Sequence, residues 1–297
     1  MAQILAPRVA IPLLMFLSSV FAANHVAARV AFDHGASVAA AVTVRSGVTA
    51  LVIVALLRLQ GVTMGLPRAT LVRGLGIGLL VALQSFCLYS AVAIIPVALA
   101  LLAFNTFPML YVLLSWAAGG EHPGRRAFVA MPMALAGLVL ALDILGTLEA
   151  MAGRWAEIGA GVAWALGSAA SFASVLFLTT RHLKDVDGRV RTLLTMGTTA
   201  VVVGLGGAAA GSLALPADAT GWLGLALLTM LYGSAITAIF TVVPKLASPS
   251  NTAALNFEPI AALILAWLIL GQAMAPRQIV GALIVVGAVI LIGAKRH

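Results

Sequence analysis

The sequence predicts an all-α integral membrane protein whose ten transmembrane helices form two inverted five-helix repeats. Its 297 residues are 62% hydrophobic and only 9% charged, whereas a soluble domain carries roughly 25% charged residues. The apolar residues gather in ten long segments, and one polar motif occurs twice at a separation of 151 residues. This composition leaves too few polar side chains to cover a water-soluble globule, and it is too apolar for a disordered chain.

Each segment has about the 20 residues that a helix needs to cross a bilayer. We interpret the segments as helices because their apolar runs are continuous, whereas the strands of a membrane barrel alternate. Pro96 separates the third segment from the fourth, which predicts a tight helical hairpin. The segments cover residues 9–32, 36–57, 73–94, 96–118, 127–147, 158–180, 192–213, 221–243, 249–270 and 278–294.

The first segment has a second interpretation. Arg8, the apolar run after it and Phe21-Ala22-Ala23 resemble a signal peptide with its cleavage site. The segment continues, however, through Asn24, His25 and Arg29. We therefore favour a first transmembrane helix with a polar face.

The basic residues predict the orientation of the chain. An even number of spans puts both termini on one side, and we place them in the cytoplasm of a bacterium, with the spans in its inner membrane. Most of the 17 Lys and Arg residues then lie on the cytoplasmic side, as the positive-inside rule requires. Only Arg29, Arg45, Arg154 and Arg277 lie outside or within a span. The net charge of +8 is thus an orientation signal, and we expect no nucleic-acid partner.

The repeated motif divides the chain into two halves, residues 1–148 and 149–297. Asn, Pro and Trp recur together at matching positions in two apolar segments. These residue types are uncommon in this composition, so chance alone rarely produces such a match. Since five spans are an odd number, the second half must enter the membrane from the opposite side, an architecture typical of secondary transporters. The matching positions are Asn105 and Asn256, Pro108 and Pro259, and Trp116 and Trp267.

These residues resemble a known family. The stretch from Asn105 through Trp116, followed by Gly120-Glu121, is similar to the repeat unit of EamA-type carriers in the drug/metabolite transporter superfamily. The second copy matches through Phe257-Glu258-Pro259 and Gly271-Gln272, with Gln272 where the family usually has Glu. The resemblance covers the whole chain and implies ten helices, cytoplasmic termini and export or exchange of small metabolites. Within the superfamily, the chain looks most like bacterial exporters of aromatic and other neutral amino acids, of the YddG type.

Two ionisable residues inside the segments are candidates for coupling or charge recognition, because a charge at membrane depth is costly. Glu258 could bind a substrate ammonium, carry a proton or pair with a basic residue such as Arg45. Its alternative is a carboxylate near a helix end, since it lies about nine residues into its predicted segment. Arg45 could clamp a carboxylate. We favour the alternative, in which Arg45 reaches an interface or bonds to carbonyls.

Polar and aromatic side chains complete the candidate substrate site. Asn105 and Asn256 line a cavity or bridge helices, and the two interpretations are equally weighted. His25 is a proton relay or, more often for a lone histidine, a structural group. Aromatic rings in the central helices would suit aromatic substrates, although rings in membranes commonly face lipid. The candidate substrate-binding residues are Tyr89, Trp164, Asn105, Asn256, Gln84, Phe86, Asn24, His25 and Tyr232.

The predicted function is a secondary exporter of small metabolites, with amino acids favoured as substrates. A multidrug or other metabolite carrier of the same fold is the alternative, and a membrane-embedded enzyme has little support, because the five histidines are scattered. No phosphate-binding G-x-x-x-x-G-K-[ST] loop occurs in the sequence. We therefore expect no cofactor and no metal. The partners are a small-molecule substrate and the lipid bilayer, and a monomer is one oligomeric state that the sequence allows.

Overall fold

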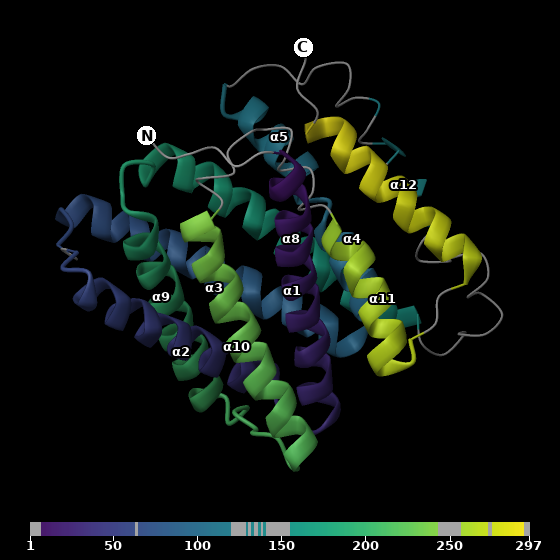
Figure 1. Cartoon of the computed structure of the whole chain (residues 1–297), viewed down its shortest axis with the longest axis horizontal. Helices are drawn as coiled ribbons and strands as arrows, with labels where there is room; N and C mark the ends of the chain where they lie inside the picture. Colours follow the sequence, from purple (N-terminus) through teal and green to yellow (C-terminus); the bar gives the residue numbers. More distant parts are fainter. Residues whose placement is uncertain are drawn as a thin grey trace.

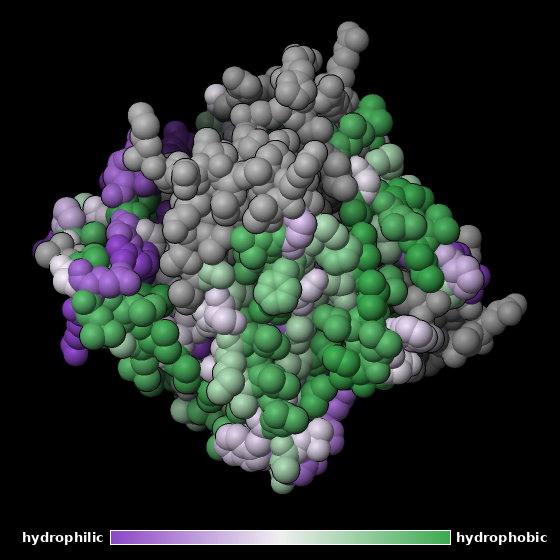
Figure 2. All heavy atoms as spheres, viewed as in Figure 1, coloured by the Kyte–Doolittle hydropathy of each residue, from purple (hydrophilic) through white to green (hydrophobic). Residues whose placement is uncertain are grey.

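The computed structural model describes residues 7–62, 65–119, 155–242, 257–272 and 275–293, with seven further residues between 129 and 140. Every regular element in these ranges is a helix, as expected for the all-α class. Large apolar side chains cover the outer face of the bundle, and hydrophilic residues gather towards its edges (Figure 2). The helices are α1 (Pro7–Asp33), α2 (Val38–Leu59), α3 (Arg68–Ile94), α4 (Val97–Phe104), α5 (Phe107–Ala117), α8 (Trp155–His182), α9 (Gly188–Ala209), α10 (Ala219–Val242), α11 (Glu258–Leu270) and α12 (Pro276–Gly293) (Figure 1).

Seven spans in the described residues are long and apolar enough to cross a membrane, with α4 and α5 counted together as one. Two shorter apolar helices, Glu258–Leu270 and Pro276–Ala288, are also present. The span expected at 127–147 falls mostly outside the described residues. Gly137, one of its described members, is helical, and a Cβ added to it would lie 2.9 Å from the carbonyl oxygen of Gly281 on α12. The chain is therefore multi-pass, and the described part alone gives nine candidate membrane helices, seven long spans and two shorter ones, rather than ten spans.

The fourth span is broken in the middle, whereas the sequence predicts one continuous segment. Asn105 and Thr106 separate α4 from α5. Pro108 explains the break, because it lacks the N–H that would bond the carbonyl of Phe104 and its ring crowds that carbonyl. The structure thus places Asn105 at a helix end, and its side chain donates to the carbonyl of Leu101 at 2.8 Å.

The second half begins a helix in the same way, 151 residues later. α5 starts at Phe107 and α11 at Glu258, and each has proline at its second position. The preceding residues have nearly the same backbone conformation, with φ −75° and ψ −9° at Thr106 and φ −72° and ψ −16° at Phe257. Glu258 therefore opens the described helix α11, whereas the sequence suggested a position about nine residues into a helix.

Contacts between the halves fix the directions of the helices. α1 and α10 are antiparallel and lie side by side (Figure 1), since His34 after α1 bonds Asp218 before α10 at 2.7 Å. Both Arg29, near the end of α1, and Gly161, near the start of α8, lie against Ile95. The end of α1 and the start of α8 therefore meet at one end of the bundle, which we call the Asp33 end. α8 thus runs opposite to α1, its counterpart in the first half.

The next two pairs of counterparts are also reversed. Gly207 near the end of α9 faces Ala39 at the start of α2, and Val190 at the start of α9 packs with Ile53 towards the end of α2. α3 ends at the Asp33 end, where α10 begins. In the described residues, α1, α2 and α3 therefore run opposite to α8, α9 and α10.

A carboxylate fastens the loops at the Asp33 end. Asp218 accepts a hydrogen bond from the backbone N–H of Gly221 at 2.8 Å and also contacts the ring of His34. The Gly221 N–H, followed by the His34 side chain, holds the pKa of Asp218 below its ordinary value. The start of α10 is thereby tied to the chain that leaves α1.

Small residues allow the helices of the two halves to approach closely, as is usual in membrane bundles. A Cβ added at Gly224 on α10 would lie 2.8 Å from the backbone nitrogen of Ala31 and 3.0 Å from the carbonyl oxygen of Ala27 on α1. These are backbone atoms, so they cannot move aside as a flexible side chain would. Gly224 is therefore required for the α1–α10 contact.

We predict that Gly224→Ala destabilises the protein by about 1–3 kcal/mol, because the added methyl group must push α1 and α10 apart. Gly76→Ala on α3 is the matched control, since no described atom outside its own helix lies within 4 Å of the added Cβ. Ala in a helix interior is favoured over Gly by roughly 0.5–1 kcal/mol, so the control should be neutral or stabilising. Unfolding of both variants in detergent would test this. A Gly224→Ala protein as stable as the control would contradict the prediction.

Candidate functional site

A polar cluster lies in the buried interior of the bundle around Arg45. This side chain comes from the middle of α2 and is 2% exposed. Its Nη1 donates to the hydroxyl of Tyr89 at 2.9 Å, and its Nη2 donates to Oγ of Ser85 at 3.0 Å. The guanidinium therefore does not reach towards an interface, and its described partners are hydroxyl groups on α3.

Tyr89 joins α2 to α1. Its hydroxyl accepts from Arg45 and donates to Oδ1 of Asn24 at 3.1 Å. The ring is 1% exposed, and the guanidinium carbon of Arg45 lies 4.8 Å from its centroid. One hydroxyl thus holds two polar side chains from two other helices in place.

The second half contributes Tyr232 from α10. The centroid of its ring lies 3.9 Å from the guanidinium carbon of Arg45, within the range of a cation–π contact. Four helices from both halves therefore meet at one charge. We call Asn24, Arg45, Ser85, Tyr89 and Tyr232 the Arg45 cluster. Four of them were predicted as site residues, and the structure brings those four together.

Ser85 is the member that sequence reasoning missed. Small hydroxyl residues are common in membrane helices and draw no attention by themselves. The available signal was spacing, because Ser85 stands four residues before Tyr89 on α3 and so shares its helix face. Thr49 is another missed neighbour, and its hydroxyl donates to the carbonyl oxygen of Arg45 at 2.8 Å.

A contact between a histidine and a glutamate lies next to the cluster. Nε2 of His25 on α1 is 3.4 Å from Oε1 of Glu258 at the start of α11, and their side chains are 7% and 21% exposed. The His25 ring lies 5.5 Å from the Tyr89 ring. Of the roles considered for Glu258, pairing with a basic side chain is thus present, but its described partner is His25 and not Arg45.

The remaining predicted residues lie at the contact between α3 and α8. Gln84 donates from Nε2 to Oγ of Ser168 at 3.2 Å, and Ser168 donates to the carbonyl of Gln84 at 3.0 Å. Phe86 and Trp164 meet edge to face with centroids 6.1 Å apart. Trp164 is 37% exposed. Gln84 and Phe86 flank Ser85 in the chain, and the Ser85 hydroxyl donates to Oε1 of Gln84 at 3.4 Å, so Gln84 is joined to the Arg45 cluster.

The two asparagines of the repeat are not brought together by the described residues. Asn105 is buried and bonds within α4, and Asn256 lies outside the described residues. Beside the helix break, Phe107 contacts Phe104 and Phe172 with ring centroids 5.4 Å and 4.8 Å apart. This aromatic group is part of the core between α4, α5 and α8.

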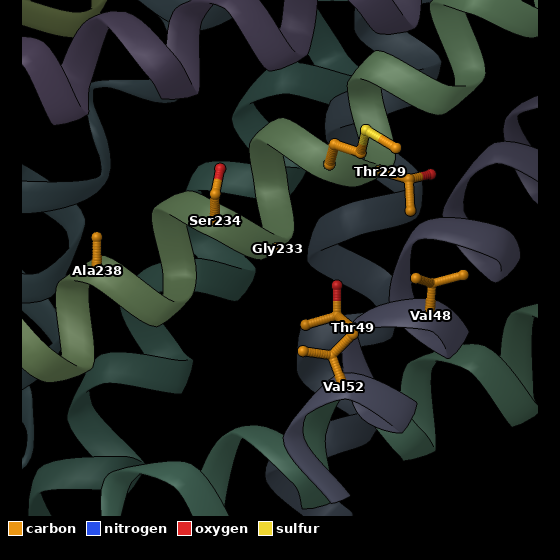
Figure 3. A pocket seen from close by; sticks show the side chains of 8 residues that line it. Val48, Thr49, Val52, Thr229, Gly233, Ser234 and Ala238 are labelled. Carbon is orange, nitrogen blue, oxygen red and sulfur yellow. The ribbon is translucent and has the colours of Figure 1, made fainter. Parts of the chain in front are cut away.

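A pocket of about 540 Å³ lies between α2 and α10, one helical turn from Arg45 (Figure 3). Thr49 follows Arg45 by four residues on α2, and Gly233 directly follows Tyr232 on α10. Most of the lining is apolar, so no polar pattern in the sequence points to this pocket. The lining residues are Val48, Thr49, Val52, Thr229, Met230, Gly233, Ser234 and Ala238.

Titratable side chains in the described part of the chain form no group of three His, Cys, Asp or Glu residues that could hold a metal ion. Cys87 is buried on α3 as a free thiol. The Arg45 cluster provides charge and hydrogen bonding through a guanidinium, hydroxyl and amide groups, and aromatic faces. The His25–Glu258 pair lies next to it.

Comparison with known proteins assigns the chain to a family. The EamA-like transporter family matches residues 9–142 and again residues 159–294. A solved structure described as "Crystal structure of protein" has the same fold, with a TM-score of 0.62 and 19% sequence identity over 94% of both chains. No curated protein matches the chain.

We predict that Tyr89→Phe lowers the free energy of unfolding by about 1–3 kcal/mol, because it leaves buried groups of Arg45 and Asn24 without their shared partner. Tyr111→Phe on α5 is the matched control, since it removes a hydroxyl away from the cluster. Detergent-purified variants can be compared by thermal or denaturant unfolding. Equal stability of the two variants would show that the Tyr89 hydroxyl is not a structural link.

Proposed function

Because the chain belongs to the EamA-like transporter family, we propose that it is a secondary transporter that exports small metabolites by alternating access. Amino acids with aromatic or neutral side chains are the proposed substrates, as in exporters of the YddG type. The observation that carries this proposal is the Arg45 cluster, which draws on α1, α2, α3 and α10 and so lies between the two halves. In transporters with inverted repeats, the substrate site lies at the interface of the repeats near the membrane midplane.

The proposed architecture is ten transmembrane helices in two inverted repeats, divided near residue 148. The reversed directions of the described counterparts and the matching helix starts at Phe107 and Glu258 support it. If each repeat adopted the conformation of the other, the cluster would be exposed first to one side of the membrane and then to the other.

The proposed location is a bacterial inner membrane with both termini in the cytoplasm. Basic side chains support this orientation, because they gather at the end of the bundle opposite to the Asp33 end, where α2 and α8 end and α3 and α9 begin. Those in the described residues include Arg58, Arg68, Arg73, Arg181, Lys184, Arg189 and Arg191.

Glu258 is the proposed proton carrier. Its carboxylate lies at the start of α11 and contacts His25, which in turn contacts the Tyr89 ring of the Arg45 cluster. A proton gained or lost at Glu258 changes the charge beside the substrate site. We propose that movement of a proton through Glu258 couples transport to a pH gradient.

We expect purified protein in proteoliposomes to catalyse saturable counterflow of a labelled amino acid from a mixture of phenylalanine, tryptophan, methionine and threonine. Counterflow requires a binding site that alternates between the two sides, so a carrier shows it and a channel does not. A labelled quaternary-ammonium dye tests the multidrug alternative in the same vesicles. Flux that rises linearly with substrate and shows no counterflow would contradict the carrier, and movement of the dye alone would favour the multidrug function.

We further predict that Glu258→Gln abolishes transport driven by a pH gradient and leaves exchange intact, because glutamine cannot release a proton. Asp185→Asn, in the exposed loop between α8 and α9, is the control for loss of a carboxylate. Both variants should be measured with an imposed pH gradient and in counterflow. An unchanged response of Glu258→Gln to the gradient would remove Glu258 from the coupling mechanism.

A further inference from the structure

Arg45 is a permanent charge without a described counter-charge. An arginine side chain remains protonated in proteins, and this one is 2% exposed. The ion pairs of the described residues do not include it. Its described partners are the neutral hydroxyls of Ser85 and Tyr89 and the two tyrosine rings. Taking a charge out of water without an opposite charge is energetically unfavourable, so such a group favours an anionic partner.

Hydrogen-bond donors without acceptors surround the same charge. Nε of Arg45 and Nδ2 of Asn24 are buried, and neither has a partner within the described residues. The hydroxyl of Ser46, the next residue on α2, is also buried and unpartnered. Guanidinium and amide N–H groups can only donate. The cluster is therefore short of acceptor oxygens.

We propose that the carboxylate of the substrate binds at Arg45 and Asn24, which makes carboxylic acids, with amino acids foremost, the substrate class. This inference rests on the proposed transport function and specifies its site. A carboxylate offers two acceptor oxygens and one negative charge, and it matches a guanidinium with a free Nε–H. The burial of Arg45 means that the halves must separate for a substrate to reach it, as alternating access requires.

A single carboxylate suits the cluster better than a phosphate. The described cluster holds one fixed positive charge, and the nearby His25 is already paired with Glu258. A phosphate group with up to two charges would need further cations or backbone donors. The faces of Tyr89 and Tyr232 and the apolar pocket between α2 and α10 provide apolar surface beside the charge.

Tyr89 is a positioning residue in this arrangement. Its hydroxyl bonds both Arg45 and Asn24, so it sets the distance between the two donors that would share the carboxylate. It also leaves Nε of Arg45 and Nδ2 of Asn24 unbonded and available. Its substitution by phenylalanine should weaken substrate binding more than it slows the transport step.

The test compares substrates that differ only in the carboxylate. Wild-type proteoliposomes are assayed for counterflow of labelled phenylalanine, tryptophan, methionine and threonine, with each unlabelled amino acid or its primary amide as competitor. We expect the amides to compete at least about tenfold more weakly, because they leave the guanidinium unpaired. Amides that compete as well as the acids would overturn the carboxylate site while transport itself stood.

Two variants and one binding measurement complete the test. Arg45→Lys keeps the charge but loses the two-pronged geometry, so it should raise the KM for the amino acid and narrow the preference over the amide. Arg45→Gln should lose that preference. If no substrate is transported, thermal stabilisation of the detergent-purified protein by amino acid and by amide decides the binding question separately. Stabilisation by the amino acid alone supports the carboxylate site, and equal effects or none overturn it.

Discussion

The bundle depends on how it accommodates one buried guanidinium. Arg45 brings a permanent charge into the interior of a chain whose other described helix surfaces are mainly apolar, and it is held by α3, α1 and α10 together. Hydroxyl groups and aromatic faces stabilise the charge without neutralising it. A carboxylate from the protein would satisfy Arg45 permanently, and a bound substrate then could not compete for it. The neutral described partners connect the helices and leave Arg45 without a described counter-charge, as the proposed carboxylate site requires.

The proline-containing helix starts provide the second constraint. Pro108 and Pro259 each stand at the second position of a helix, 151 residues apart, and the residue before each helix has nearly the same backbone angles. The first residue of each helix differs between the halves. In the first half it is Phe107, which packs with Phe104 and Phe172, and in the second it is Glu258, which contacts His25. One repeated backbone feature therefore presents an aromatic side chain in the first half and an ionisable side chain in the second.

The apolar segments were predictable because bilayer thickness sets the length of a membrane-spanning helix. Each span therefore shows in the sequence as a run of about 20 apolar residues. The described helices agree with the expected segments to within about five residues, except at the Asn105–Thr106 break and at the start of α11, whose described part begins at Glu258. The repeat and the family also followed from the sequence. The partners of polar residues did not, because hydrogen bonds such as Arg45 to Ser85 depend on which faces of separate helices meet. Arg45, for example, was expected at an interface or on carbonyls, but the structure buries it among hydroxyl groups.

Two contacts that correspond in the repeat, α3 with α9 and α10 with α2, are not packed equally tightly. Between α3 and α9, added Cβ atoms at Gly74 and Gly78 would lie 2.8 Å and 2.7 Å from Leu194 and Thr198, so this interface is full. The corresponding contact between α10 and α2 contains the 540 Å³ pocket, and a Cβ at Gly233 would lie 3.9 Å from Thr49. Inverted repeats with identical packing would leave the site equally closed or equally open towards both sides. Alternating access instead needs one contact closed while its counterpart is loose, with the two arrangements close in energy so that they can exchange. In the proposed alternating-access mechanism, α2 and α10 would close on the pocket beside the Arg45 cluster when the full interface between α3 and α9 separates.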